Sequence, residues 1–226
     1  MSRLSIIIPT LNEAALIAGL LRAVHALRRK GDEVIVVDGG SDDGTAELVA
    51  RHDDVLLLQA ERGRAAQMNA GAHLARGEVL WFLHADTLPP LGAADALIAG
   101  LADSGRDWGH FDVRLADAHG LLRAVAPLMN LRARLTGIAT GDQGLFVRRA
   151  LFVAVGGFPA IELMEDVALS RRLKRRGPPV CLAATLLTSS RRWETRGVLR
   201  TILLMWSLRL AYALGVAPGR LARWYR

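Results

Sequence analysis

Hydrophobic positions in the first half of the chain follow two alternating patterns. Short runs rich in β-branched residues have the length of buried strands, and the segments between them carry apolar residues at helical spacing. Strands separated by helices of this length form βαβ units, so the pattern predicts an α/β fold with a mostly parallel central sheet flanked by helices. The predicted strands are 4–8, 33–37, 55–58 and 79–83, and the predicted helices between them are 13–28, 43–52 and 64–75.

The second half has a less regular pattern. No repeat or linker-like tract interrupts it. We therefore expect one domain over residues 1–190, followed by a basic and apolar helical appendage over 191–226. Within the domain, the pattern predicts helices over 92–102, 121–135 and 165–176 and strands over 108–115 and 144–148.

Three predicted strands end in segments that are polar, glycine-rich or acidic. These segments are 9–13 (PTLNE), 38–44 (DGGSDDG) and 84–86 (HAD). In an open parallel sheet, ligands bind beyond the carboxyl ends of the strands. The placement therefore predicts a ligand site at this edge of the sheet.

Asp38 and Asp86 are the acids that follow two of these strands. Asp38 precedes two glycines that permit close approach of a ligand, and its carboxylate is suited to hydrogen bonds from a ribose or a base edge. The local alternative is a turn in which Ser41 or Asp42 caps the next helix. Asp86 is suited to hold Mg²⁺ or Mn²⁺ while a diphosphate supplies further ligands. Its local alternative is a polar strand end before a proline turn.

Arginines supply candidate phosphate contacts. Arg64 lies at a predicted helix N-terminus, where the helix dipole favours anions, and Gln67 adds an amide nearby. Arg192 follows Arg191 and precedes Trp193, so this run has the chemistry to clamp a diphosphate beside a stacking face. A solvated basic surface is the alternative at both places.

Glu165 and Asp166 open a predicted basic helix. Acids in a first helical turn are common partners of the helix dipole. The functional alternative is a general base that takes a proton from an acceptor hydroxyl, with 141–144 (GDQG) lining the acceptor side.

Net charge and cysteine content narrow the function classes. The 226 residues include 29 basic and 22 acidic side chains, a formal net charge of +7, which favours polyanionic partners unless it only reflects an Ala- and Arg-rich composition. Cys181 is the single cysteine, so no intrachain disulfide can form. The start of the chain lacks the pattern of a secretory signal, and we expect a cytoplasmic location.

Five histidines show no metal-ligand spacing and are interpreted as surface or structural residues: His25, His52, His73, His110 and His119.

Residues 198–216 form a strongly apolar segment that Arg200 and Arg209 interrupt. Each arginine near the centre of a spanning helix costs about 2.5–3.5 kcal/mol, so we do not expect the segment to cross a membrane. One interpretation is a helix in the membrane interface, with the arginines on anionic lipid. The other is packing on the main domain, or on a second copy in a homo-oligomer. The aromatic anchors of the interfacial helix would be Trp206, Tyr212 and Trp224.

Taken in their order along the chain, the strand-end segments and the Glu165–Asp166 pair resemble motifs of the family 2 glycosyltransferases, which are inverting enzymes with the GT-A fold. PTLNE is similar to the family's P-x-x-N-E turn, and 36–45 (VVDGGSDDGT) is similar to its V-D-x-x-S-x-D-x-T segment. Residues 69–71 (NAG) resemble its N-x-G helix, and 83–86 (LHAD) lie where its D-x-D usually occurs. Glu165–Asp166 resembles its E-D pair. The resemblance covers roughly residues 1–176. Within the family, the sequences of these motifs are similar to those of a small bacterial subgroup.

The resemblance implies a nucleotide-sugar donor, a divalent cation (Mn²⁺ or Mg²⁺) and an unidentified acceptor, which could be lipid-linked. Asp86 would bind the cation, and Asp166 would be the base in a single displacement. His84 replaces the first Asp of D-x-D, which leaves the metal's identity open. Arg192–Trp193 resembles the Q-x-x-R-W of processive members, but the Gln is missing, so we infer no processivity. The nucleotide would be bordered by Pro9, Thr10, Asn12, Glu13, Asp38 and Asp42.

Three other function classes fit parts of the sequence. A nucleotidyltransferase of similar fold would carry a glycine-rich loop with Arg and Lys after the first strand, where this chain has PTLNE. A non-catalytic nucleotide- or membrane-binding module is disfavoured by the joint presence of Asp38, Asp86 and Asp166. A nucleic-acid binder has only the net charge in its favour, and we expect no nucleic-acid partner.

Overall fold

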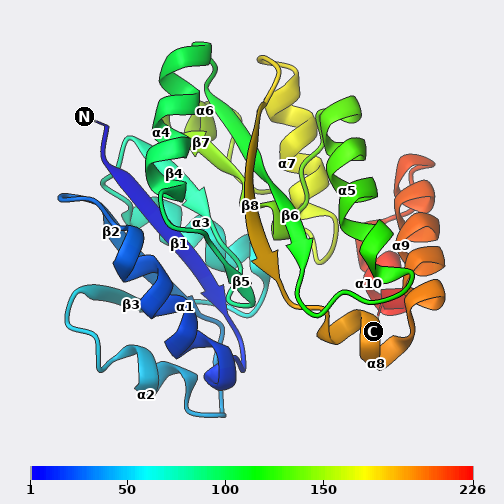
Figure 1. Cartoon of the computed structure of the whole chain (residues 1–226), viewed down its shortest axis with the longest axis horizontal. Helices are drawn as coiled ribbons and strands as arrows, with labels where there is room; N and C mark the ends of the chain where they lie inside the picture. The colour runs from blue at the N-terminus through cyan, green and yellow to red at the C-terminus, as the bar shows by residue number, and fades with distance from the viewer. Residues whose placement is uncertain (1, 226) are drawn as a thin grey trace.

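The computed structural model describes residues 2–225, and the side chains of Arg192 and Arg196 lie outside the described residues. An eight-stranded sheet with the order β3-β2-β1-β4-β7-β6-β8-β5 is flanked by helices (Figure 1). The strands are β1 (Leu4–Thr10), β2 (Glu33–Asp38), β3 (Val55–Gln59), β4 (Val79–Phe82), β5 (Thr87–Leu88), β6 (Trp108–Leu115), β7 (Phe146–Arg148) and β8 (Val180–Thr188). The helices are α1 (Ala14–Leu27), α2 (Thr45–Val49), α3 (Arg64–Leu74), α4 (Ala93–Ser104), α5 (Leu122–Thr136), the 3₁₀ turn η1 (Gly141–Gln143), α6 (Arg149–Ala154), α7 (Glu165–Lys174), α8 (Arg191–Arg196), α9 (Val198–Ala213) and α10 (Pro218–Tyr225).

The sheet is parallel over its first four strands. β1 pairs in parallel with β2 and β4, and β2 pairs with β3, which confirms the predicted βαβ units. β7 runs antiparallel between β4 and β6, and β8 is parallel to β6. No sequence pattern predicts β8, because buried and exposed residues do not alternate regularly along it.

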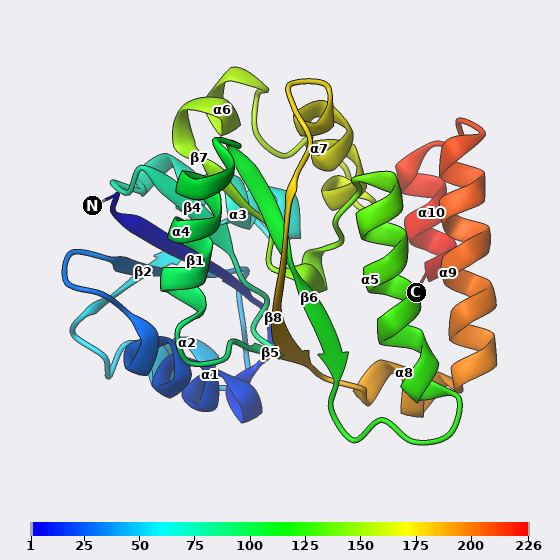
Figure 2. The same cartoon turned by 45° about the horizontal axis from the view of Figure 1, so that its top comes forward.

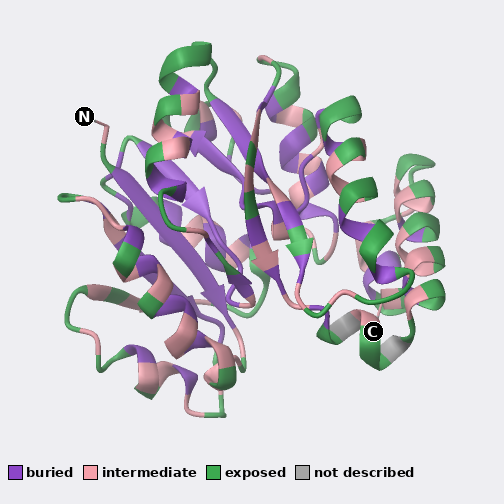
Figure 3. Ribbon diagram, viewed as in Figure 1, coloured by how far each residue is buried: buried purple, intermediate pink, exposed green. Residues whose placement is uncertain are grey.

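Alternating residues of the parallel strands supply two apolar layers. Ile6 and Ile8 pack with apolar residues of α1, α2 and α4, whereas Ile7 points to the other face and packs with α3, α6 and α7. Both layers are fully buried along β1 and β4 (Figure 3). The strand ends are thereby held rigidly, which is the condition for a precise site on the loops that follow them.

β1 is longer than the sequence pattern predicts. The prediction that the strand stops before Pro9 is wrong, since β1 continues to Thr10. Pro9 lies opposite Val37 of β2, while pairing with β4 ends at Ile7. The proline therefore interrupts no hydrogen bond of the sheet, because its missing N–H faces the side where pairing has already ended.

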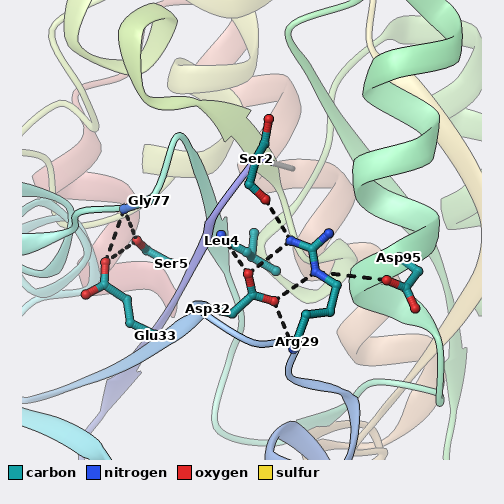
Figure 4. Close-up of polar contacts among 8 residues, drawn as sticks. All are labelled: Ser2, Leu4, Ser5, Arg29, Asp32, Glu33, Gly77 and Asp95. Atoms are coloured by element: carbon teal, nitrogen blue, oxygen red, sulfur yellow. Dashed lines mark hydrogen bonds and ion pairs between the residues drawn. The ribbon is translucent and has the colours of Figure 1, made fainter.

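Polar groups at the amino ends of the strands satisfy one another (Figure 4). Arg29 donates two hydrogen bonds of 3.0 Å to the carboxylate of Asp32, which also accepts the Leu4 N–H at 2.9 Å. Ser5 and Glu33 accept hydrogen bonds from the Gly77 N–H at 2.8 and 3.2 Å. This edge of the sheet is structural, which leaves the carboxyl edge for ligands.

The C-terminal helices pack beside the main sheet, with α5, α9 and α10 side by side at one end of the molecule (Figure 2). Leu208 and Leu221 contact apolar residues at the start of α7, and Arg171 lies 5.1 Å above the ring of Tyr212. Tyr212, predicted as a membrane anchor, therefore has a packing role within the protein. Trp193 likewise packs on the apolar core.

Within residues 2–225, none of the helices combines the length and the hydropathy needed to span a bilayer. The division into a domain over 1–190 and an appendage over 191–226 stays a prediction.

Candidate active site

The loops that follow β1 and β2 hold each other in place. Asn12, in the left-handed region with φ 55°, donates its N–H to Ser41 Oγ at 2.9 Å and accepts the Asp42 N–H at 3.0 Å. The Ala14 N–H, at the start of α1, donates to Asp43 Oδ2 at 2.9 Å. Asn12 and Asp42 thus shape the predicted nucleotide side of the site, and their contact with a nucleotide stays a prediction.

Asp38, Thr10 and Gln67 lie buried beneath these loops. The carboxylate of Asp38 accepts two backbone N–H groups of the turn that follows it, at 3.0 and 2.9 Å. Gln67 Nε2 donates to the carbonyl oxygens of Thr10 and Val37 at 2.7 and 2.8 Å, and so ties β1 to β2. The hydroxyl of Thr10 donates to Val37 O and Asp38 Oδ1 at 3.4 Å. All three side chains thus have a supporting role, and their direct contact with a nucleotide stays a prediction.

Glu13, in the loop after β1, lies near four charged side chains, those of Arg191, Asp86, Arg64 and Asp43. Burial raises the pKa of Glu13, and the nearby charge of Asp86 adds to the rise, whereas Arg191 and Arg64 oppose it. Arg191 Nη2 lies 3.7 Å from Glu13 Oε2, so the basic run that begins α8 reaches this part of the site. The side chain of Arg192, the predicted diphosphate contact of that run, lies outside the described residues.

His84, Asp86 and Asp142 form a group with metal-ligating chemistry. One potential ligand atom from each lies within 4.8 Å of the others, and His84 Nδ1 is 3.3 Å from Asp142 Oδ1. The imidazole stands where the family motif has a carboxylate, and Asp142, which arrives from η1, supplies a second carboxylate. A nitrogen and two carboxylates fit a divalent transition-metal ion.

Gly141 joins this group to Asp166. A Cβ at position 141 would lie 2.2 Å from His84 Cε1, so only glycine permits the ring and the turn to meet. The Gly141 N–H donates to Asp166 Oδ2 at 2.8 Å. The predicted acceptor-side segment 141–144 therefore contacts both the cation group and the predicted base.

Glu165 and Asp166 differ in their access to a substrate. Glu165 is only 5% exposed, and burial, with a further contribution from Asp166, raises its pKa to about 7. The charges of Arg64 and His84 oppose that rise, which places Glu165 beneath the site among them. Asp166 is half-buried, and its carboxylate is held by backbone N–H donors. Asp166 is thus the better placed of the two to reach an acceptor.

The sequence does not predict the place of three residues near the site. Asp142 is not predicted as a metal ligand, and Arg132 and Arg209 are not predicted to lie near the site. Arg132 belongs to α5 and Arg209 to α9, and both interact electrostatically with Asp142 and Asp166. From the sequence, Arg209 is interpreted as an interruption of an apolar helix and, with Arg200, as a contact to anionic lipid. A charge in such a helix does signal a buried polar neighbour, but the sequence does not say which one.

A second group of potential ligand atoms lies at the opposite edge of the sheet, at His25, His52 and Asp54. Arg28 Nη2 already donates to Asp54 Oδ2 at 2.7 Å, and His25 contacts the same oxygen. The carboxylate of Asp54 therefore already has a guanidinium and an imidazole as partners, which supports the structural interpretation of His25.

The family model for glycosyl transferase family 2 matches residues 5–138. The chain belongs to glycosyl transferase family 2. The resemblance inferred from the strand-end motifs is thereby confirmed.

Curated relatives of this family 2 chain include synthases and glycosyltransferases. It is 29% identical over 182 residues to the poly-beta-1,6-N-acetyl-D-glucosamine synthase of Staphylococcus aureus (strain COL), which covers 74% of the chain and 44% of that protein. It is 30% identical over 204 residues to the "uncharacterized glycosyltransferase MT1564" of Mycobacterium tuberculosis, with 86% and 76% covered. The chain thus spans less than half the length of the synthase.

Solved structures of similar fold have been determined with nucleotides. Staphylococcus aureus TarS 1–349 in complex with UDP has a TM-score of 0.70 at 22% identity, over 83% of this chain and 60% of that one. The mannosyltransferase PcManGT from Pyrobaculum calidifontis, in complex with GDP-Man and Mn²⁺, has a TM-score of 0.67 at 24% identity, over 99% and 69%. This likeness confirms the predicted GT-A fold of the family 2 chain.

Proposed function

We propose that the chain is an inverting glycosyltransferase that moves a sugar from a nucleoside diphosphate sugar to an acceptor hydroxyl. The observation that carries the proposal is the contact of Gly141 with both His84 and Asp166. A group suited to bind a cation and a diphosphate thus lies next to a carboxylate suited to act as base. Direct displacement requires this proximity.

The proposed step is a single displacement at the anomeric carbon. The acceptor oxygen forms a bond to this carbon while the bond from the carbon to the diphosphate oxygen breaks. Asp166 takes the hydroxyl proton, and the nucleoside diphosphate leaves with the bonding electrons. The donor would lie against the loops after β1 and β2 and the start of α3, near Pro9, Thr10, Asn12, Glu13, Asp38, Asp42, Arg64 and Gln67, with Arg192 as a further predicted contact.

The divalent cation would be held by His84, Asp86 and Asp142. When bound, it would neutralise the negative charge that develops on the diphosphate. Mg²⁺ prefers oxygen ligands and retains water, so an imidazole beside two carboxylates favours Mn²⁺. The Mn²⁺ complex of PcManGT supports the same choice.

Titration calorimetry with UDP and GDP, each with and without Mn²⁺, tests the donor site. We expect one of the nucleotides to bind in a Mn²⁺-dependent manner, and Asp86→Ala to weaken this binding at least about tenfold, because loss of one charged ligand from a cation site costs more than about 1.4 kcal/mol. Asp103→Ala removes an exposed carboxylate at the end of α4 and should leave the affinity unchanged.

Two outcomes would contradict the donor-site assignment: neither nucleotide binds under any condition, or Asp86→Ala binds as tightly as the wild type. A nucleotidyltransferase would instead release pyrophosphate from a nucleoside triphosphate when a sugar phosphate is added. A non-catalytic module would bind a nucleotide without turning over any donor.

We further propose that α9 and α10 dock on an anionic membrane surface from the cytoplasmic side. One face of α9 is apolar yet exposed to solvent, which a soluble surface rarely tolerates over this length (Figure 3). The face consists of Leu199, Leu203, Trp206, Leu210 and Leu214, which are 62–76% exposed and are called the α9 stripe below. Trp224 of α10 is 54% exposed.

Charge favours lipid as the occupant of the α9 stripe. Residues 191–226 contain eight of the 29 basic and one of the 22 acidic side chains, a net charge of +7, whereas residues 1–190 contain 21 of each. Two copies that met through these segments would repel each other, but an anionic bilayer would attract them.

Vesicle sedimentation tests this surface. We expect the wild type to bind vesicles of phosphatidylglycerol and phosphatidylcholine more tightly than vesicles of phosphatidylcholine alone. Leu203→Ser/Trp206→Ser should weaken binding at least about tenfold, because it removes two large apolar groups from the interface. The matched control, Leu91→Ser/Val153→Ser, alters two side chains that are equally exposed elsewhere. Absence of vesicle binding, or a dimer in solution that the first variant dissociates, would contradict the proposal.

A further inference from the structure

A cavity of about 390 Å³ lies beside α7, outside the candidate active site. The apolar side of α7 packs on the sheet, whereas another side of the helix, with Arg171, Arg172 and Arg175, lines the cavity. Tyr212 and the turn 215–218, which leads from α9 to α10, line it as well. Pockets that bind small molecules have volumes of about 300–1,000 Å³, so the cavity has room for a small ligand or a headgroup.

The cavity carries positive charge that no carboxylate of the lining neutralises. None of the lining residues is acidic, and among the residues that the structure describes none of the three arginines forms an ion pair. Arg171 and Arg175 lie four positions apart on one helix, where like charges repel each other. The C-terminus of α7 offers only about half a negative charge in compensation. An anion in the cavity would therefore relieve this repulsion.

The one carboxylate that follows a lining residue in the loop before α7 belongs to Glu162, and it lies beside α10. Glu162 Oε1 would be 3.5 Å from a Cβ added at Gly219, at the start of α10. A carboxylate is a favourable partner for a helix N-terminus. Glu162 is thereby accounted for without a contact to the arginines of the cavity.

Two of the guanidinium groups are held in place by neutral partners. Arg172 Nη1 donates to the carbonyl oxygens of Val155 and Gly157, both at 3.3 Å, which leaves Nε and Nη2 for other acceptors. Arg171 lies 5.1 Å above the ring of Tyr212, and a cation–π contact of this kind orients a guanidinium without neutralising it. A ligand would thus meet donors that are already ordered, which lowers the entropic cost of binding.

We propose that this cavity binds a phosphate group, which Arg171, Arg172 and Arg175 contact. The planar guanidinium donates in a bidentate manner to phosphate oxygens. The site is separate from the donor site, since none of the residues of the cation group or the nucleotide loops lines the cavity. Asp166, in the first turn of α7, precedes Arg175 by nine positions, or about 13 Å along the helix axis. The inference therefore does not depend on the proposed function.

Two sources supply such a phosphate group. The cavity adjoins the α9 stripe, because Leu214, the last residue of the stripe, directly precedes Gly215 of the lining. A lipid headgroup at the proposed membrane surface is thus one source, and a free phosphate compound in solution is the other. The recognised chemistry is the same in both cases.

A phosphorus NMR titration of inorganic phosphate with the full chain tests the site. EDTA is present, so that the proposed cation group holds no metal ion. We expect saturable binding by the wild type and binding at least about tenfold weaker by Arg171→Gln/Arg175→Gln, because two charge-assisted hydrogen-bond donors are lost. Arg22→Gln/Arg51→Gln is the matched control, since it removes two arginines that are exposed elsewhere, and it should bind phosphate like the wild type.

Arg64→Gln separates this cavity from the donor site, because Arg64 is the predicted phosphate contact at the start of α3. Loss of phosphate binding in Arg64→Gln, with unchanged binding in Arg171→Gln/Arg175→Gln, would assign the phosphate to the donor site and overturn the proposal. Absence of phosphate binding by the wild type would overturn it as well.

The folding of the variants is checked by circular dichroism during thermal unfolding. Arg171→Lys/Arg175→Lys keeps both charges but not the bidentate geometry, so it should lose less affinity for phosphate than the Gln variant. If Arg171→Gln/Arg175→Gln does not fold, Arg175→Gln alone is compared with the wild type, because Arg175 is exposed and forms none of the contacts that hold its neighbours.

Vesicle sedimentation distinguishes the two sources of phosphate. Vesicles of phosphatidylcholine with phosphatidic acid, whose headgroup is a bare phosphate, are compared with vesicles of phosphatidylcholine with phosphatidylglycerol at equal surface charge. If the source is a lipid headgroup, the wild type prefers phosphatidic acid, and Arg171→Gln/Arg175→Gln loses this preference while the α9 stripe still binds both vesicles. If the source is a free compound, inorganic phosphate binds through the arginines and the wild type shows no preference.

Discussion

Asp166→Asn is expected to lower kcat about a thousandfold, while the affinity for the nucleotide stays within about twofold of the wild type. Asn has the shape of Asp and retains an oxygen that accepts the Gly141 N–H, but it cannot take a proton from the acceptor. The loss should therefore fall on the chemical step. The measurement is release of UDP or GDP from the donor, with Mn²⁺ and a bacterial lipid extract as the source of acceptor.

Glu165→Gln is the matched control, because it changes the neighbouring carboxyl group in the same way. Glu165 is buried, and its raised pKa of about 7 means that the protonated form, which Gln resembles, is already populated at neutral pH. We expect a change in kcat of only a few-fold. If Glu165→Gln abolishes turnover while Asp166→Asn retains more than about a tenth of it, the assignment of the base is wrong.

The nucleotide half of the site could be predicted because its signals are local. Pro9 to Glu13 and Asp38 to Gly44 each follow directly on a buried strand, and parallel strands bring such segments to one edge of the sheet. Some residues of the family motifs nevertheless stabilise the fold instead of lining the site. Asn69 exchanges two hydrogen bonds with the backbone of Phe158, at 2.8 and 3.0 Å, so this part of the motif stabilises the fold.

The other half of the site could not be predicted, because it depends on contacts between distant segments. Asp142 lies 58 positions after His84 in the sequence, and the short 3₁₀ turn η1 brings it to 3.3 Å from the imidazole. No hydrophobic periodicity predicts this turn. The sequence around Arg209 does not indicate the contacts of its side chain, because these depend on how α9 packs on the rest of the protein. The sequence pattern of β8 is too irregular to predict the strand that extends the sheet beside β6.

Gly141→Ala is expected to weaken Mn²⁺-dependent nucleotide binding at least about tenfold and to lower turnover about a hundredfold. The added Cβ would lie 2.2 Å from Cε1 and 2.4 Å from Nε2 of His84, so the ring or the turn must move. Movement of the ring removes a predicted metal ligand, and movement of the turn displaces Asp142 and the N–H that holds Asp166. Gly177→Ala is the control, because a Cβ there would contact nothing within 4 Å.

A double variant shows whether the loss passes through His84. In His84→Ala the ring is absent, so the added methyl at position 141 has space, and His84→Ala/Gly141→Ala should bind Mn²⁺ and nucleotide no more weakly than His84→Ala. Additive losses would mean that Gly141 acts through the backbone turn alone. Nucleotide binding by Gly141→Ala that equals the wild type would mean that His84 can leave its position at no cost, and His84 would then not be a ligand of the cation. The coupling between these two positions thus tests whether the histidine that departs from the family motif is part of the metal site.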